Sequence, residues 1–163
     1  MTVVDYACAI VRSPVAEPPE AQAGLLVETV ERQGTTYAEI IRAGVTVDRT
    51  RFVSPPGSSF QFGLLANEAG YHEPPHVHSP VRRAIGDLQQ MFVVQRGVVE
   101  VDFYSPDGER FRTVRLETGD AITLVHGAHA IRVVEDFQAI SVKQGPFLGD
   151  DQDKVVVHTD PAA

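Results

Sequence analysis

The residues of this chain best suited to chemistry are two histidines, His76 and His78, separated by a single valine. Successive side chains of a β-strand point to opposite faces, so on a strand both imidazoles would project from the same face. Neutral imidazole is the commonest protein ligand for divalent transition metals. Further ligands must come from neighbouring strands, and the sequence offers Gln90 and His129 as candidates. The pattern predicts a metal site built on the histidine pair.

The rest of the sequence predicts many short strands. Val99, Val101 and Phe103 alternate with other residues, which suits a strand with one buried face. No stretch of 11 or more residues has a convincing helical period. The expected strands are residues 25–31, 36–43, 46–53, 60–66, 89–96, 98–104, 110–116, 121–125, 130–134 and 138–144, with residues 3–11 as a further candidate. Short strands at regular spacing favour an all-β antiparallel sandwich or barrel.

Length and composition fit one domain in a soluble protein. The chain has 163 residues, of which 43% are hydrophobic, and a net charge of -8. Such an acidic surface repels phosphate groups, which excludes nucleic acid and anionic membranes as partners. The N-terminus has no charged signal-peptide region, and no apolar run is long enough to span a membrane. We expect a cytoplasmic protein with an arm and proline-rich linker (1–24), a barrel (25–150) and a tail (151–163).

Two groups of residues resemble the two sequence motifs of the cupin superfamily. In the first motif a glycine precedes His-x-His, an acidic residue and a second glycine, and the similar residues are Gly70, His76, His78, Gln90 and Gly97. The second motif runs from Gly-Asp to a glycine and a histidine, and the similar residues are Gly119, Asp120, Gly127 and His129. The resemblance implies a single-domain jelly-roll β-barrel of the cupin type.

The same resemblance implies one divalent transition metal, such as Zn, Ni, Mn or Fe, held by His76, His78, Gln90 and His129. The stretches VEVDFYSPDGE and VKQGPFLGDDQDK also resemble an uncharacterised cupin group associated with sugar and surface-polysaccharide metabolism. That second resemblance implies a link to carbohydrate metabolism.

The second motif leaves two histidines as alternatives. Gly127 is followed by a single residue before His129, so the turn is shorter than in the family and His126 is a rival ligand. His129 shares its strand face with Ile131 and Val133, which we expect in the core, whereas His126 faces the other way. The histidine that is not a ligand would lie at the rim of the barrel.

Eleven residues separate His78 from Gln90, far more than the family usually has. We expect this extra length to form a loop over the mouth of the barrel. Arg82 and Arg83 in the loop would offer charge-assisted hydrogen bonds to an anionic ligand. The alternative is that both arginines are solvated or paired with the acidic surface.

Gln90 stands where the family has a carboxylate. Three neutral imidazoles and an amide leave the full charge of a divalent ion in the cavity, which favours Lewis-acid chemistry or simple binding over dioxygen chemistry. The alternative is a metal-free barrel that keeps polar residues inside.

The function that follows is an isomerase or lyase acting on a small polar molecule, sugar-derived or acidic. The metal would polarise a carbonyl or hydroxyl, and His72, Tyr71 or His126 would move a proton. The alternatives are a non-catalytic binding or sensing module and a metal-dependent dioxygenase, because one barrel hosts many functions. A site lined only by Phe, Val and Leu beyond the ligands would favour binding.

We also expect a homodimer. Residues 3–11 are apolar and β-prone, and the proline-rich stretch after them is long enough to carry them away from their own barrel. Docking on an edge strand of a second copy would bury Val3, Tyr6 or Ile10. The alternatives are that this segment pairs within its own sheet or does not dock.

Overall fold

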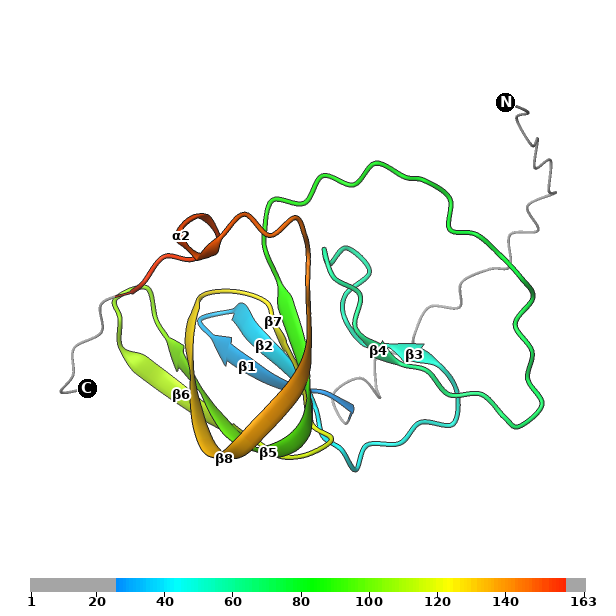
Figure 1. Cartoon of the computed structure of the whole chain (residues 1–163), viewed down its shortest axis with the longest axis horizontal. Helices are drawn as coiled ribbons and strands as arrows, with labels where there is room; N and C mark the ends of the chain where they lie inside the picture. The colour runs from blue at the N-terminus through cyan, green and yellow to red at the C-terminus, as the bar shows by residue number, and fades with distance from the viewer. Residues whose placement is uncertain (1–25, 158–163) are drawn as a thin grey trace.

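The structure is a computed structural model that describes residues 26–157, and these fold as a strongly curled antiparallel sheet with a small hairpin beside it (Figure 1). The elements are β1 (Glu28–Arg32), β2 (Thr35–Ile41), β3 (Arg51–Phe52), β4 (Gly63–Leu64), β5 (Gln90–Tyr104), β6 (Arg110–Leu116), β7 (Ala121–Leu124), β8 (Ala128–Lys143) and the four-residue helix α2 (Asp150–Asp153). The prediction of an all-β fold is confirmed. The candidate strand at residues 3–11 lies outside the described residues.

Strand β5 is the centre of the main sheet. Along one side its first half pairs with β7 and its second half pairs with β6, while β8 pairs with its other side along the whole length. The order β1-β2-β7-β5 places β1 at one edge of the sheet and β8 beyond β5 at the other edge.

The sequence predicted a break at Gly97, and this prediction is wrong. β5 is continuous through Gly97, which has a φ of 86°, a conformation that residues with a Cβ rarely adopt. The ladder to β8 shifts register here, and a side chain at Gly97 would overlap the carbonyl of Asp136. The glycine therefore bends the strand through a bulge instead of ending it.

The bend brings the two ends of β5 to the same end of the curled sheet. Leu124 lies opposite Gln90 at the start of β5, and Ala128 lies opposite Tyr104 at its end. Only three residues, 125–127, separate Leu124 from Ala128, so these two Cα atoms are at most about 14 Å apart. A straight strand of this length would span about 50 Å. We call this end of the curled sheet, formed by both ends of β5 and the turn 125–127, the mouth.

The core lies on the inner side of the curl, which we call the interior face. Val99, Val101 and Phe103 are fully buried there, as their alternation predicted. The other buried apolar residues of this cluster are Val30, Tyr37, Ala38, Ile40, Phe92, Val94, Val114, Leu116, Ile122 and Leu124.

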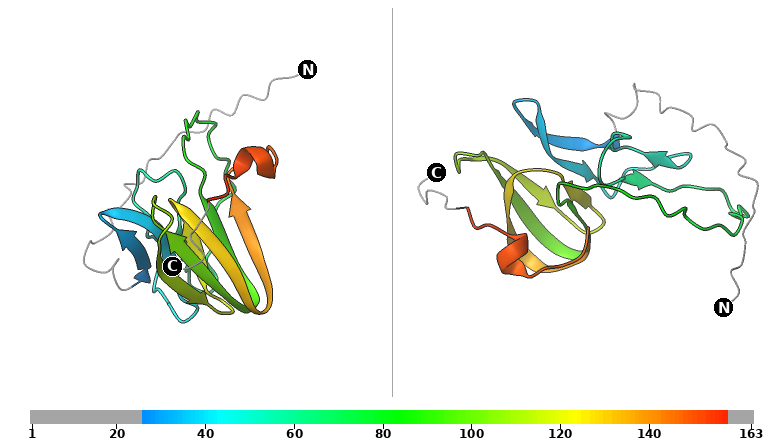
Figure 2. Two further views of the ribbon diagram at one scale, coloured as in Figure 1. Left: turned by 90° about the vertical axis from the view of Figure 1, so that its left-hand side faces the viewer. Right: turned by 90° about the horizontal axis from the view of Figure 1, so that it is seen from above.

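The histidine pair does not lie on a strand, contrary to the sequence prediction. His76 and His78 belong to the long segment 65–89 between β4 and β5, which runs outward from the sheet (Figures 1 and 2). Pro75 and Pro80 flank the pair and lack the N–H that a sheet ladder needs. Hairpin strands β3 and β4 are likewise much shorter than the predicted runs 46–53 and 60–66.

Within residues 26–157 no helix is long and apolar enough to cross a membrane.

Candidate functional site

Gln90 lies at the mouth with its amide held in place. It is the first residue of β5 and faces Leu124 on one side and Lys143 on the other. Its Nε2 donates a hydrogen bond of 2.9 Å to Ser141 Oγ on β8. Among the described residues its Oε1 accepts no hydrogen bond, so this oxygen is free to meet a ligand.

His129 lies at the other end of the same ribbon and also reaches the mouth. It is opposite Phe103 in the β5–β8 ladder, and residues directly opposite in an antiparallel pair share a face. The surrounding protein removes water from the ring and lowers its pKa, although a hydrogen bond with the Gly127 backbone acts in the opposite direction. The residue as a whole is nevertheless exposed. The lowered pKa favours neutral imidazole, the form that binds metals.

His126 lies in the turn between β7 and β8. Its ring packs edge-on against Tyr37 with 5.8 Å between the ring centroids, and its backbone N–H donates to the Tyr37 carbonyl at 3.2 Å. Gly127 packs so closely on the same Tyr37 ring that a side chain there would overlap it. This contact fixes the turn that presents His129.

His76 and His78 lie side by side although their segment is not a strand. Their rings are 5.3 Å apart and nearly perpendicular. His76 Nδ1 lies 3.1 Å from the Pro74 carbonyl oxygen and 3.6 Å from a Glu73 carboxylate oxygen. A carbonyl that engages Nδ1–H leaves Nε2 with the lone pair, an arrangement common in metal-binding histidines.

The structure brings one pair of the predicted ligands together. His76 and His78 are neighbours in the outer segment, whereas Gln90 lies at the start of β5 and His129 lies opposite Phe103 near its end. Their chemistry suits a divalent transition metal. Within the part of the chain that the structure describes, however, no three His, Cys, Asp or Glu side chains form a group that could hold a metal. The complete ligand set stays a prediction.

The remaining candidates also lie in segment 65–89. Tyr71 is 59% exposed, and His72, Arg82 and Arg83 are exposed. Neither arginine makes a hydrogen bond or an ion pair with another described residue, and their contact with an anionic ligand stays a prediction.

The loop runs outward from the mouth instead of across it (Figure 1). Its C-terminal end is fixed by Asp87, which accepts hydrogen bonds from Ser59 at 2.5 Å and from the Gln89 side chain at 2.8 Å. These contacts fasten the end of the loop beside the segment that precedes β4.

Behind the rim, the buried cluster contains no Asp, Glu, His, Lys or Cys, and its one titratable side chain is Tyr37, whose ring packs against His126. The wall that leads inward from Gln90 and His129 consists of apolar residues, namely Phe92, Val94, Val99, Val101, Phe103, Leu124 and Ile131. Sequence reasoning missed Ser141, because its role depends on the register between β5 and β8. The apolar wall is what we expected of a binding site.

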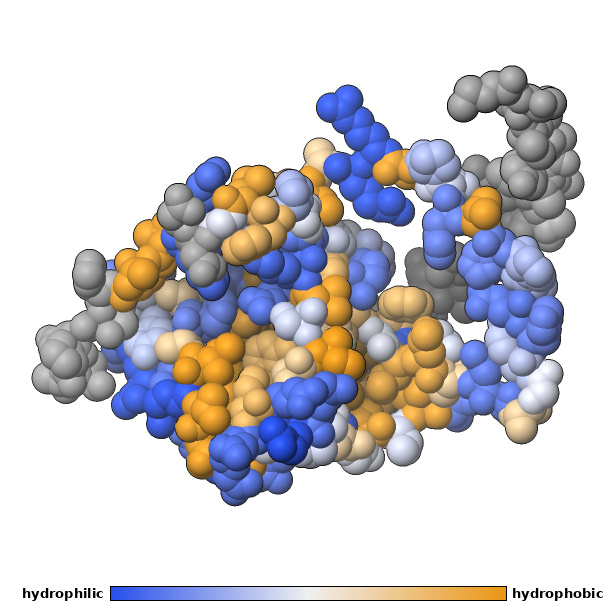
Figure 3. All heavy atoms as spheres, viewed as in Figure 1, coloured by the Kyte–Doolittle hydropathy of each residue, from blue (hydrophilic) through white to orange (hydrophobic). Residues whose placement is uncertain are grey.

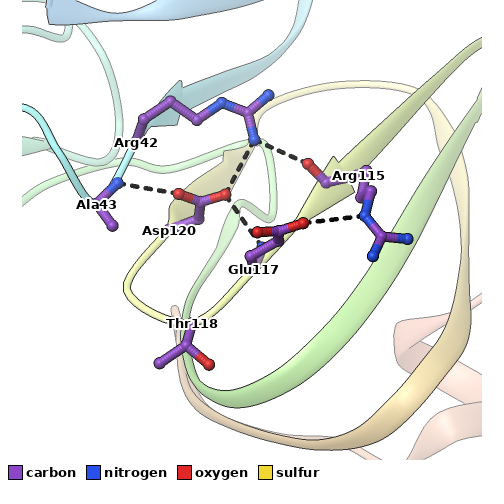
Figure 4. A pocket seen from close by; sticks show the side chains of 6 residues that line it. All are labelled: Arg42, Ala43, Arg115, Glu117, Thr118 and Asp120. Atoms are coloured by element: carbon purple, nitrogen blue, oxygen red, sulfur yellow. Dashed lines mark hydrogen bonds and ion pairs between the residues drawn. The ribbon is translucent and has the colours of Figure 1, made fainter.

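A separate hollow of about 330 Å³ lies beside the β6–β7 turn (Figure 4). Arg42 spans it, donating to Glu28 at 2.7 Å and to Asp120 at 3.0 Å. Asp120 also accepts the backbone N–H groups of Ala43 and Glu117. Because these charged groups pair with one another, we interpret them as interactions that stabilise the β6–β7 turn rather than as a ligand site.

Comparison with known proteins does not identify the chain, because no family model, curated protein or solved structure matches it.

Proposed function

We propose that the chain is a cupin-type jelly-roll protein that binds a small polar molecule at the mouth of its curled sheet. The observation that carries this proposal is the division of the site into a polar rim and an apolar wall. Gln90, Ser141 and His129 supply the polar groups, and the buried interior face lies behind them. Ligand sites typically combine an apolar lining with a few placed polar groups.

The backbone supports the cupin-type class within this proposal. The four glycines of the two motifs, Gly70, Gly97, Gly119 and Gly127, all have φ between 75° and 92°. Gly97 and Gly127 also allow close contacts that a Cβ would block. The motif positions thus require glycine for physical reasons, beyond their match in spacing.

We assign one divalent metal in this proposal to His76, His78, Gln90 and His129. Segment 65–89 would have to carry the histidine pair to the mouth. A bound Zn, Ni, Mn or Fe ion would act as a Lewis acid towards a carbonyl or hydroxyl oxygen. Ser141 accepts a hydrogen bond from the Gln90 side-chain nitrogen, and the lowered pKa of His129 favours its neutral ring.

Binding or sensing is the first choice over catalysis because the buried cluster behind the rim holds no acid or base apart from the phenol of Tyr37, which packs against His126. A metal-dependent isomerase or lyase is the second candidate. Tyr71 and His72 lie in the same segment as the histidine pair and would move with it, which would supply a proton donor or acceptor.

Metal analysis of purified protein, followed by thermal-shift screening of sugar acids with and without chelator, tests the proposal. We expect one metal per chain and stabilisation by a sugar acid. Replacing both histidines, His76→Ala with His78→Ala, should remove the metal and leave a folded β protein. His72→Ala in the same segment is the matched control and should keep the metal. Unchanged metal content in the double variant would contradict the ligand assignment.

Turnover separates the two candidates. Conversion of a stabilising sugar acid would favour the isomerase or lyase, and dioxygen consumption by ferrous-loaded protein would indicate a dioxygenase. Binding without either reaction supports the first choice.

A further inference from the structure

The core ends abruptly at β8. Val99 and Val101 are fully buried on β5, yet the residues opposite them on β8, Val133 and Ile131, are 61% and 44% exposed. Residues opposite one another in an antiparallel ladder share a face. Ile131 and Val133 therefore point to the interior side, as the sequence predicted, but the prediction that they are buried is wrong for the described residues.

The same strand has a free edge. β8 is 16 residues long and pairs with β5, and no other described strand pairs with it. β8 carries four charged residues. Glu135 and Asp136 lie at the register shifts beside Gly97, and Lys143 pairs with Asp153 at 3.0 Å. The charge of Arg132, next to Ile131 and Val133, is held on its own sheet by Asp102 at 3.0 Å and Glu100 at 2.8 Å. An exposed apolar edge of this length is normally paired or covered. In Figure 3 hydrophobic side chains are visible at the front of the molecule around β8, with hydrophilic ones beside them at the bottom of its bend.

The sequence contains one segment that matches this surface. In a strand at residues 3–11, the side chains of Val4, Tyr6, Cys8 and Ile10 would share one face, and all four are apolar or aromatic. The described chain begins next to β1, at the opposite edge of the sheet from β8. Residues 12–25 include three prolines and can span up to about 50 Å. Linkers rich in proline act as semi-rigid spacers, which favours delivery to a neighbouring molecule.

We propose that residues 3–11 of a second copy add as a strand to the free edge of β8 and cover Ile131 and Val133. The added strand would pair the backbone groups of the edge and continue the core. It would also complete the wall of the mouth site beside His129, so each site would be whole only in the dimer. This inference names the acceptor surface for the dimer and does not depend on a metal.

Cys8 provides the test, because it is the chain's single cysteine and lies within the docking segment. The full-length variants Val133→Cys and Ile131→Cys are oxidised and examined on non-reducing gels and by mass spectrometry. We expect a Cys8 disulfide that links two chains in at least one of them. Adding Cys8→Ser should abolish that link. Arg112→Cys on β6, where the side chain is 56% exposed, is the matched control and should not link to Cys8.

A Cys8 disulfide within one chain would overturn the proposal in favour of docking on the chain's own sheet. Failure of both variants to link would overturn it as well. Light scattering adds an independent measurement on the full chain. We expect a dimer that becomes a folded monomer with Tyr6→Asp or Val133→Asp. A wild-type monomer, or a dimer indifferent to both changes, would contradict the proposal while leaving the metal and ligand assignments open.

Discussion

The side-chain nitrogen of Gln90 donates to the hydroxyl of Ser141 at 2.9 Å, which joins the start of β5 to the end of β8 at the mouth. With its nitrogen engaged, the amide keeps an oxygen that accepts no hydrogen bond from another described residue. Amide oxygen is a metal ligand and a hydrogen-bond acceptor, so Ser141 decides which function Gln90 can perform. Ser141 is thus a positioning residue of the proposed site.

Ser141→Ala should weaken metal or ligand binding by about two- to tenfold, the usual worth of one neutral hydrogen bond. The loss should appear in affinity measured by titration calorimetry, with little change in the thermal midpoint of the unliganded protein. Ser141→Thr keeps the hydroxyl and should restore affinity. Equal affinity in the alanine variant would show that Gln90 is not oriented through Ser141.

Gln90→Glu should tighten metal binding and shift preference towards iron or manganese. The new carboxylate adds an attraction of about 1–4 kcal/mol at contact distance, which corresponds to roughly fivefold or more in affinity. Competition between metals, followed by elemental analysis, measures the effect. An affinity that does not change would place Gln90 outside the ligand set.

Glu39→Gln should stabilise the protein at neutral pH. Glu39 is 9% exposed, lies opposite Thr123 on the outer side of the sheet, and has no hydrogen-bond partner among the described residues. Burial raises the pKa of its carboxyl. The folded state therefore holds its proton more tightly than the unfolded chain, and ionising Glu39 costs stability. An uncharged amide of the same size should recover about 1–2 kcal/mol at pH 7.

The pH dependence gives the control for Glu39. A carboxyl whose pKa is raised by folding contributes stability at pH values below its pKa in the unfolded chain, which is about 4.3. This stability is lost as the pH rises through its pKa in the folded protein. Urea unfolding between pH 4 and 8 should show that decline in the wild type and less of it in Glu39→Gln. Parallel profiles would mean that Glu39 is not desolvated in solution.

Much of the sheet followed from local pattern, and the failures have physical causes. The alternation of Val99, Val101 and Phe103 gave the correct buried face because packing of one face is a local property of a strand. The continuity of β5 through Gly97 was missed, since a bulge depends on the partner strand that closes on it. For the same reason the sequence could not reveal the Gln90–Ser141 contact, which requires the register of residues 51 positions apart.

The site was less predictable than the sheet. Spacing correctly indicated that His76 and His78 lie together, but the prolines around them keep them off the sheet. The alternation of side chains along the strand correctly placed Ile131 on the interior side. It does not tell whether another part of the protein covers that side. Both errors arise because the contacts that decide them are made by distant parts of the chain or by another molecule.

Arg132→Met should destabilise the protein more than Asp102→Asn. The Asp102 side chain is 3% exposed on the outer side of the sheet, whereas that of Arg132 is 52% exposed. The guanidinium donates to both carboxylate oxygens, at 3.0 and 3.2 Å, and Thr113 donates at 2.5 Å. Losing the arginine leaves a buried charge without its main partner, while losing the carboxylate charge leaves an arginine that water and Glu100 can solvate.

The decrease of stability at acidic pH tests the same ion pair, Arg132 and Asp102. Hydrogen bonds from Arg132 are the main cause that holds the pKa of Asp102 below its usual range. Desolvation raises this pKa, and the hydrogen bond from Thr113 lowers it further. A carboxyl whose pKa is lowered by folding contributes stability at pH values above its pKa in the unfolded chain, which is about 3.9. This stability is lost as the pH falls through its pKa in the folded protein. Thermal midpoints between pH 2 and 6 should therefore fall less steeply in Asp102→Asn than in the wild type. Arg115→Met, which removes an exposed pair with Glu117, is the matched control and should follow the wild-type profile. If Arg132→Met and Arg115→Met destabilise the protein equally, the Asp102 pair has no special role in holding β5, β6 and β8 together.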